Sequence, residues 1–143
     1  MKIKQLSVFL ENKSGRLAAV TRLLAEKDIN IRALSIADTS DFGILRLIVD
    51  QPDKAYGGLK EAGFTVSLTE VLGIEMPDRP GGLNNILEIM GKAGINIEYL
   101  YAFIGRAGNG AMVIFRVEEP DKAVDIMKAR GITVLDEEKI YHL

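Results

Sequence analysis

Two short loops carry the residue types best suited to binding a small charged molecule. Each loop joins an apolar, β-prone stretch to a predicted helix, and the free N–H groups at a helix start attract anions. A glycine in each loop lets a ligand approach the backbone, and an Asn or Asp before it can accept a hydrogen bond from an ammonium group. The loops read Asn12-Lys13-Ser14-Gly15-Arg16-Leu17 and Asp78-Arg79-Pro80-Gly81-Gly82-Leu83.

This combination is a simple way to hold an α-amino acid. The carboxylate would lie on the helix N–H groups and the ammonium group on Asn12 or Asp78. Each such charge-assisted bond contributes about 1.5–3 kcal/mol. The structural interpretation is that these residues only make turns, with Ser14 as the N-cap of the first helix. The residues alone leave both interpretations open.

Asn30 and Asn96 form a second pair of candidates. Each lies between two isoleucines at the entry to the next predicted strand. One interpretation is a turn exit with the isoleucines in the core, and the other is a polar anchor beside the first loop. The candidate ligand-binding residues therefore also include Asn30, Ile31, Asn96 and Ile97.

The remaining residues offer little for catalysis. The chain has no cysteine, so it has no disulfide and no thiolate ligand or nucleophile. Its one histidine, His142, is next to the last residue, which argues against a histidine-based metal site or triad. The acidic residues are scattered, without a pair placed for general acid–base work. We expect no catalytic residue, no metal ligand and no cofactor.

Two further segments have a chemical and a structural interpretation. Residues 105–110 read G-x-x-G-x-G, the reverse of the dinucleotide-binding spacing, and join two predicted strands. We interpret them as a β-hairpin, whose extra residues could make a flap over a site. Tyr99, Tyr101 and Phe103 alternate along a strand and share one face, which favours a domain interface over an aromatic ligand pocket.

Composition and charge narrow the class of protein. A net charge of −2 and a pI near 5.5 argue against a general nucleic-acid binder, which needs a basic face. The apolar run at the N-terminus is interrupted by Ser7 and is too short for a signal peptide. No apolar run approaches membrane-spanning length. We expect a cytoplasmic protein with no nucleic-acid and no membrane partner.

The elements that position the two loops occur twice. The spacing from Gly15 to Gly81 equals that from Asn30 to Asn96, and each half later carries a P-D-K-A and a G-x-T-V segment. Such a repeat overrides the single domain that 143 residues alone would indicate. We expect two small domains of one fold, 1–68 and 69–143, packed close together because no linker separates them.

Each half is expected to run β-α-β-β-α-β. This order gives a four-stranded antiparallel sheet with both helices on one face, the ferredoxin-like plan of the α+β class. Residues 140–143, beyond the repeat, could add an edge strand. The first half has strands at 3–10, 29–37, 44–49 and 64–68, with helices at 17–27 and 52–61. The second has strands at 70–76, 95–103, 111–117 and 132–135, with helices at 81–93 and 120–130.

The pattern strand–(D/N)-x-x-G-x-L–helix–x-I-N-I–strand on this frame resembles the ACT domain. ACT domains are regulatory modules that bind amino acids or similar small metabolites in amino-acid metabolism. The second half carries D-R-P-G-G-L and G-I-N-I and matches the family closely. The first half departs from the family pattern at three positions. Asn12 stands in place of Asp, Ser14 in place of Pro, and Asp28 in place of Gly. If only one site functions, we expect it at the second loop.

The resemblance covers nearly the whole chain and implies a stand-alone tandem ACT protein without an attached catalytic domain. Its two domains would form a pseudo-dimer. In the family, ligands sit where two ACT domains meet, with the first loop of one domain facing the second strand of its neighbour. This implicates 12–17 and 78–83, with 30–31 and 96–97 near them. It implies a non-catalytic amino-acid sensor that forms a homodimer and has an enzyme of amino-acid metabolism as a possible partner.

Two alternatives stay open. The pair could be an interaction module for a partner enzyme and bind no small ligand. More remotely, a small enzyme of ferredoxin-like fold, such as an acylphosphatase, would need an Arg-bearing phosphate loop and a well-placed Asn. The chain matches that requirement only weakly, with Arg16 or Arg79 as the arginine and Asn30 or Asn96 as the asparagine.

Overall fold

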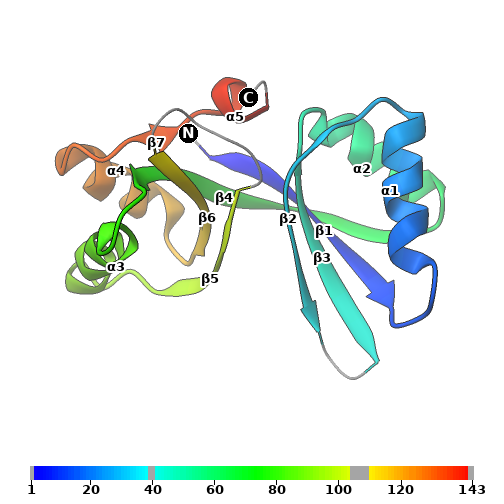
Figure 1. Ribbon diagram of the computed structural model, residues 1–143, viewed down its shortest axis with the longest axis horizontal. Helices are drawn as coiled ribbons and strands as arrows, with labels where there is room; N and C mark the ends of the chain where they lie inside the picture. The colour runs from blue at the N-terminus through cyan, green and yellow to red at the C-terminus, as the bar shows by residue number, and fades with distance from the viewer. Residues whose placement is uncertain (1, 39–40, 104–109, 142–143) are drawn as a thin grey trace. The chain divides into compact units, whose positions relative to one another are not determined.

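The computed structural model describes residues 2–38, 41–103 and 110–141. The chain forms two compact units (Figure 1). Each unit has its own hydrophobic core. We call Lys4–Thr69 the first unit, and the chain from Glu70 onward together with the residues up to Ile3 the second unit. Residues 39–40, most of the glycine-rich segment 105–110 and His142 lie outside the described residues.

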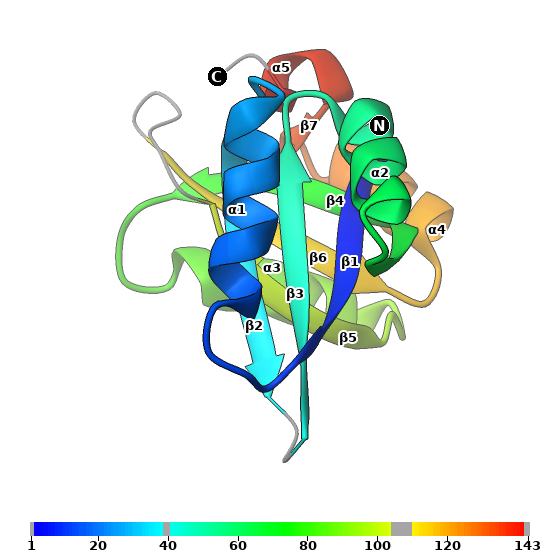
Figure 2. The same ribbon diagram turned by 90° about the vertical axis from the view of Figure 1, so that its right-hand side faces the viewer.

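The first unit is a four-stranded sheet with two helices on one face (Figure 2). Its strand order is β2-β3-β1-β4, and β3 pairs antiparallel with both β1 and β2. The expected ferredoxin-like plan is confirmed. Its elements are β1 (Ile3–Glu11), α1 (Arg16–Glu26), β2 (Ile31–Asp38), β3 (Phe42–Val49), α2 (Pro52–Glu61) and β4 (Thr65–Pro77).

Alternation along the strands builds the core of the first unit. Leu6, Val8 and Leu10 alternate along β1 and are all buried, as expected of a strand with one face on a core. Burying each such side chain contributes about 1.5–3 kcal/mol. The cluster comprises Leu6, Val8, Leu10, Val20, Leu24, Ile29, Leu45, Leu47, Val49, Ala55 and Leu59.

The second unit repeats this plan. Its strand order is β7-β4-β6-β5, with β4 antiparallel to β6 and β7, and β5 antiparallel to β6. Leu72, Ile74 and Met76 of β4 alternate into its core with the fully buried Phe115. The remaining elements are α3 (Gly82–Lys92), β5 (Ile97–Ala102), β6 (Gly110–Val117), α4 (Pro120–Ala129), β7 (Val134–Leu135) and α5 (Glu137–Tyr141).

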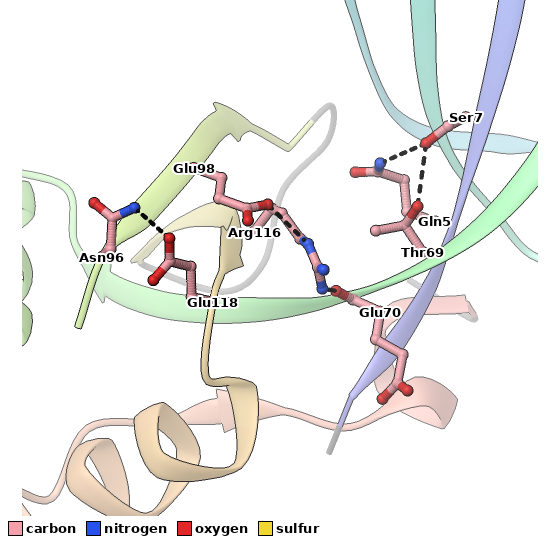
Figure 3. A network of polar contacts seen from close by, with 8 residues as sticks. All are labelled: Gln5, Ser7, Thr69, Glu70, Asn96, Glu98, Arg116 and Glu118. Atoms are coloured by element: carbon pink, nitrogen blue, oxygen red, sulfur yellow. Dashed lines mark hydrogen bonds and ion pairs between the residues drawn. The ribbon is translucent and has the colours of Figure 1, made fainter.

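Polar contacts tie neighbouring strands together within each unit (Figure 3). In the second unit, the Arg116 side chain donates from Nε to Glu98 Oε2 at 3.1 Å and from Nη1 to the Glu70 carbonyl at 2.8 Å. In the first unit, the Ser7 and Thr69 hydroxyl oxygens lie 3.4 Å apart. These contacts link β6 to β5 and β4, and β1 to β4. No helix within the described residues is both long and apolar enough to cross a membrane.

Two expected elements differ in the structure. The strands expected at 64–68 and 70–76 are one strand, β4, because no turn interrupts the chain between them. The edge strand expected from Ile140 is wrong, since residues 137–141 form helix α5. Asp136 Oδ1 accepts the Lys139 N–H at 2.8 Å, and two glutamates occupy the first turn. An Asp before two glutamates is a helix-start signal.

Candidate functional site

The two candidate loops have the same backbone. Gly15 and Gly81 are the N-cap residues of α1 and α3, with φ of 87° in both and ψ of −9° and −8°. This left-handed conformation costs a residue with a side chain about 1–2 kcal/mol, which is why glycine suits both positions. The expectation that Ser14 caps α1 is wrong, because the N-cap is Gly15 and no side chain caps the helix.

The first turn of each helix leaves two backbone N–H groups without an acceptor in the part of the chain that the structure describes. In α1 the N–H of Arg16 donates to the Lys13 carbonyl at 3.3 Å, and that of Ala19 to the Gly15 carbonyl at 3.0 Å. In α3 the N–H groups of Gly82 and Asn85 have the equivalent acceptors. The unpaired N–H groups are those of Leu17, Ala18, Leu83 and Asn84. Together with the helix dipole they favour an anion.

The first loop borders a hollow of about 190 Å³. Four of the predicted site residues line it, and so do four that sequence reasoning missed. Ile36 comes from the far end of β2 and Gly43 from the start of β3. The alternation of side chains along β2 is the sequence signal that could have identified Ile36, because it places Ile36 on the same face as Leu34. The lining residues are Leu10, Glu11, Asn12, Lys13, Arg16, Leu17, Ile36 and Gly43.

An ion pair sets the electrostatics of the first loop. Lys13 Nζ lies 3.0 Å from Glu11 Oε2. The hydrogen bond and charge of Lys13 hold the pKa of the Glu11 carboxyl below its ordinary value of 4.5. Glu11 is therefore ionised at neutral pH, and its charge is already matched by Lys13.

Most of the second loop is exposed to solvent, but one of its residues, Gly82, has no room for a side chain. Asp78, Arg79, Pro80 and Gly81 are exposed, whereas Gly82 is buried. A Cβ on Gly82 would lie 2.2 Å from the Pro77 carbonyl oxygen, so only glycine fits there without a backbone shift. Leu83 is 37% exposed, which matches the 38% of Leu17 in the first loop.

Within each unit, Asn30 and Asn96 lie away from the loops. The first loop precedes α1 and Asn30 follows it, and a helix of 11 residues is about 16 Å long. The Asn30 N–H donates to Asp50 Oδ1 at 2.9 Å, and the Asn30 carbonyl accepts the Asp50 N–H at 3.1 Å. In the second unit Asn96 Nδ2 donates to Glu118 Oε1 at 3.0 Å (Figure 3). These contacts hold the start of β2 and β5 to the end of β3 and β6.

The aromatic residues of β5 do share one face. The Tyr99 and Tyr101 rings are stacked, with centroids 6.5 Å apart and planes at 22°. Tyr101 is buried and Tyr99 half-buried. Within residues 2–38, 41–103 and 110–141, no group of three or more His, Asp or Glu residues is placed to hold a metal ion.

Comparisons with solved structures agree with this architecture. A protein of Bacteroides thetaiotaomicron is 45% identical in sequence, over 100% of this chain and 98% of the other, with a TM-score of 0.94. The ligand-free regulatory subunit of aspartate kinase from Thermus thermophilus is 18% identical over 88% of this chain and 91% of its own, with a TM-score of 0.63. At 18% identity the second likeness shows the fold alone.

The regulatory subunit of aspartate kinase from Thermus flavus is similar at a TM-score of 0.59 and 15% identity, over 88% of this chain and 90% of that subunit. No curated protein sequence matches the chain. A family model described as an ACT domain pair matches residues 1–143. The expected resemblance to tandem ACT domains, which are regulatory modules, is confirmed. The chain belongs to the ACT domain pair family.

Proposed function

We propose that this protein is a non-catalytic regulatory module that binds a free α-amino acid at the loop–helix starts of its ACT domains. The observation that carries the proposal is the pair of matched helix starts. At each, a left-handed glycine leaves the backbone open and two first-turn N–H groups lack an acceptor among the described residues. A ligand carboxylate is the group that these N–H groups fit best.

The surroundings of the first loop can bind the ammonium group and the side chain of an amino acid. Asn12 offers a side-chain oxygen to an ammonium group, and the adjoining hollow of about 190 Å³ gives room for a side chain. Leu17 and Ile36 supply apolar surface there. In the second loop Asp78 takes the place of Asn12. Its carboxylate is a stronger partner for an ammonium group than the amide oxygen of Asn12.

A calorimetric screen of the twenty standard amino acids against the intact protein tests the proposal. We expect at least one to bind, and Gly81→Asp or Gly15→Asp to weaken its binding about tenfold or more. The added carboxylate would lie where the ligand carboxylate binds, and like charges repel. Silence across the panel from a well-folded protein would overturn the proposal.

Asn substitutions are matched controls for the two Asp variants. Asn has the size of Asp and tolerates the left-handed conformation equally well, but it carries no charge. We expect Gly81→Asn and Gly15→Asn to retain most of the affinity. Equal losses in the Asp and Asn variants would indicate a steric effect and remove the support for a carboxylate at that loop. The loop at which Asp and Asn differ is the functional one.

We also propose that the module works as a homodimer and acts on an enzyme of amino-acid metabolism. The likeness of its fold to the regulatory subunit of aspartate kinase supports the kind of partner. Light scattering at several protein concentrations tests the dimer, which should persist at micromolar concentration. Co-purification with and without the bound amino acid tests the enzyme partner, whose recovery should change with ligand.

A further inference from the structure

The first unit has another hollow, of about 350 Å³, at the end of its sheet. We call it the aromatic hollow and define it by Phe9, Phe42, Phe64 and Arg16. It lies where β1 ends, β3 begins and the turn after α2 enters β4. Phe9 and Phe42 are each 51% exposed. Aromatic surface left in water at the rim of a concave site is typical of a ligand-binding position.

Arg16 gives the aromatic hollow a cation. Its guanidinium carbon lies 5.1 Å from the centre of the Phe64 ring. Its Nε is buried and, among the described residues, has no hydrogen-bond partner. A buried charged donor without an acceptor is unfavourable, and a bound anion would supply the acceptor.

The one acidic residue that lines the aromatic hollow does not meet this need. Glu11 Oε2 lies 3.0 Å from Lys13 Nζ, so its carboxylate already has a partner of opposite charge. The hydrogen bond and charge of Lys13 lower the pKa of Glu11 most, and the charge of Arg16 also lowers it, but less. The charge left for a ligand is therefore positive and comes from Arg16. An incoming ammonium group would meet a carboxylate that is already paired.

The second unit contains the same hollow without this chemistry. That hollow measures about 370 Å³ and is lined at the equivalent positions by Glu75, Gly110 and Ile132 in place of Phe9, Phe42 and Phe64. Gly82 stands in place of Arg16. The hollow therefore follows from the fold, whereas the three aromatic rings and the cation are confined to the first unit. Phe64 also packs against the core of the first unit, whereas Phe9 and Phe42 are half exposed.

We propose that the aromatic hollow binds a small organic acid with an aromatic body. The carboxylate pairs with the Arg16 guanidinium, and the ring lies among Phe9, Phe42 and Phe64. No α-ammonium group is needed, which separates this ligand from the amino acid proposed for the loops. The site goes beyond the proposed function, and it shares Arg16 and Glu11 with the hollow at the first loop. The three phenylalanines distinguish the two sites, because none of them lines the hollow at the loop.

Isothermal titration of the intact protein with 3-phenylpropanoate tests the site, with propanoate and phenethylamine as matched probes. Propanoate lacks the ring, and phenethylamine replaces the carboxylate by an ammonium group. We expect 3-phenylpropanoate to bind about tenfold or more tightly than either, because charge and ring act together. Equal affinities, or no binding of 3-phenylpropanoate, would overturn the proposal.

Two substitutions assign the binding to this hollow. Arg16→Gln removes the charge and should weaken binding of 3-phenylpropanoate about tenfold or more. Phe64→Leu keeps an apolar side chain in the core and should weaken it less. Arg22→Gln, on the exposed side of the same helix, changes the net charge equally and should have no effect. Equal losses in Arg16→Gln and Arg22→Gln would indicate a general charge effect and contradict the site.

Amide chemical shifts locate the probe. We expect 3-phenylpropanoate to shift Phe9, Phe42 and Thr65, and to leave Glu75 and Ile132 unchanged. The opposite pattern would contradict the proposal. The rival occupant is a second copy of the chain covering the two exposed rings. If Phe9→Ser dissociates an oligomer while 3-phenylpropanoate fails to bind the wild type, the rings are an interface and the proposal is wrong.

Discussion

Arg16 in the first unit and Gly82 in the second occupy the same place in the repeat, one residue after the left-handed N-cap glycine. The backbone at the caps is nearly identical, but the space beside it is not. In the second unit the Pro77 carbonyl lies where a Cβ of residue 82 would be. In the first unit Glu11 replaces Pro77, and a long cationic side chain reaches over Phe64. One backbone plan thus supports an aromatic, cationic hollow in one unit and a tight glycine turn in the other.

Gly82→Ala is expected to have the largest effect among the substitutions that test this difference between the two loops. Its Cβ would meet the Pro77 oxygen at 2.2 Å, and that atom belongs to the backbone, so the loop or the helix must move. We expect the free energy of unfolding of the second unit to fall by about 2–3 kcal/mol. Urea denaturation followed by amide signals of the second unit measures the change.

Gly81→Ala is the matched control for this prediction. A Cβ at Gly81 meets nothing within 4 Å, so the cost comes only from its φ of 87° and should be about 1 kcal/mol. In the first unit, Arg16→Ala should cost less than either, because a Cβ is already accommodated there. A Gly82→Ala protein as stable as the wild type would show that the two loops do not differ in tightness.

A smaller difference separates the ends of α1 and α3. Asp28 adopts φ of 58°, where the second unit has Gly94 at 72°. Asp28→Gly should raise the free energy of unfolding of the first unit by about 0.5 kcal/mol, since relief of the left-handed strain exceeds the added entropy of the unfolded chain. Gly94→Asp should lower that of the second unit by about 1 kcal/mol. Thermal denaturation of both variants measures the pair, and changes of the same sign would contradict the account.

The smallest effect concerns the Glu11–Lys13 ion pair, which the second loop lacks because Pro77 stands in place of Glu11. The folded-state pKa of Glu11 is lowered, so the pair stabilises the protein above the unfolded-state pKa. That contribution is lost as the pH falls through the lowered folded-state pKa. Lys13→Gln should return the pKa of Glu11 toward 4.5. An NMR titration of the Glu11 carboxyl carbon measures this pKa directly. The same midpoint in the wild type and in Lys13→Gln would show that Lys13 and Glu11 do not form an ion pair in solution.

Local signals predicted most of the elements correctly. Apolar alternation at Leu6, Val8 and Leu10 marks β1, and Pro52 and Pro120 both open helices, as the fixed φ of proline favours. The tail was misread because the apolar residues after Lys139 outweighed the helix-start signal at Asp136. Ser14 was misread because the same loop offers both a hydroxyl cap and a glycine that adopts the left-handed conformation.

By itself the sequence determined the repeat, the ferredoxin-like order of elements and the loop chemistry at Gly15 and Gly81. These rest on periodicity and short-range turn chemistry, which neighbouring residues carry. Only the tertiary structure decided that Ile36, and not Asn30, lies beside the first loop, because β2 runs back along α1 and its far end returns there. It alone brought Phe9, Phe42 and Phe64 around Arg16. These residues lie on separate strands and loops, and their meeting depends on strand order and register, which no local spacing encodes.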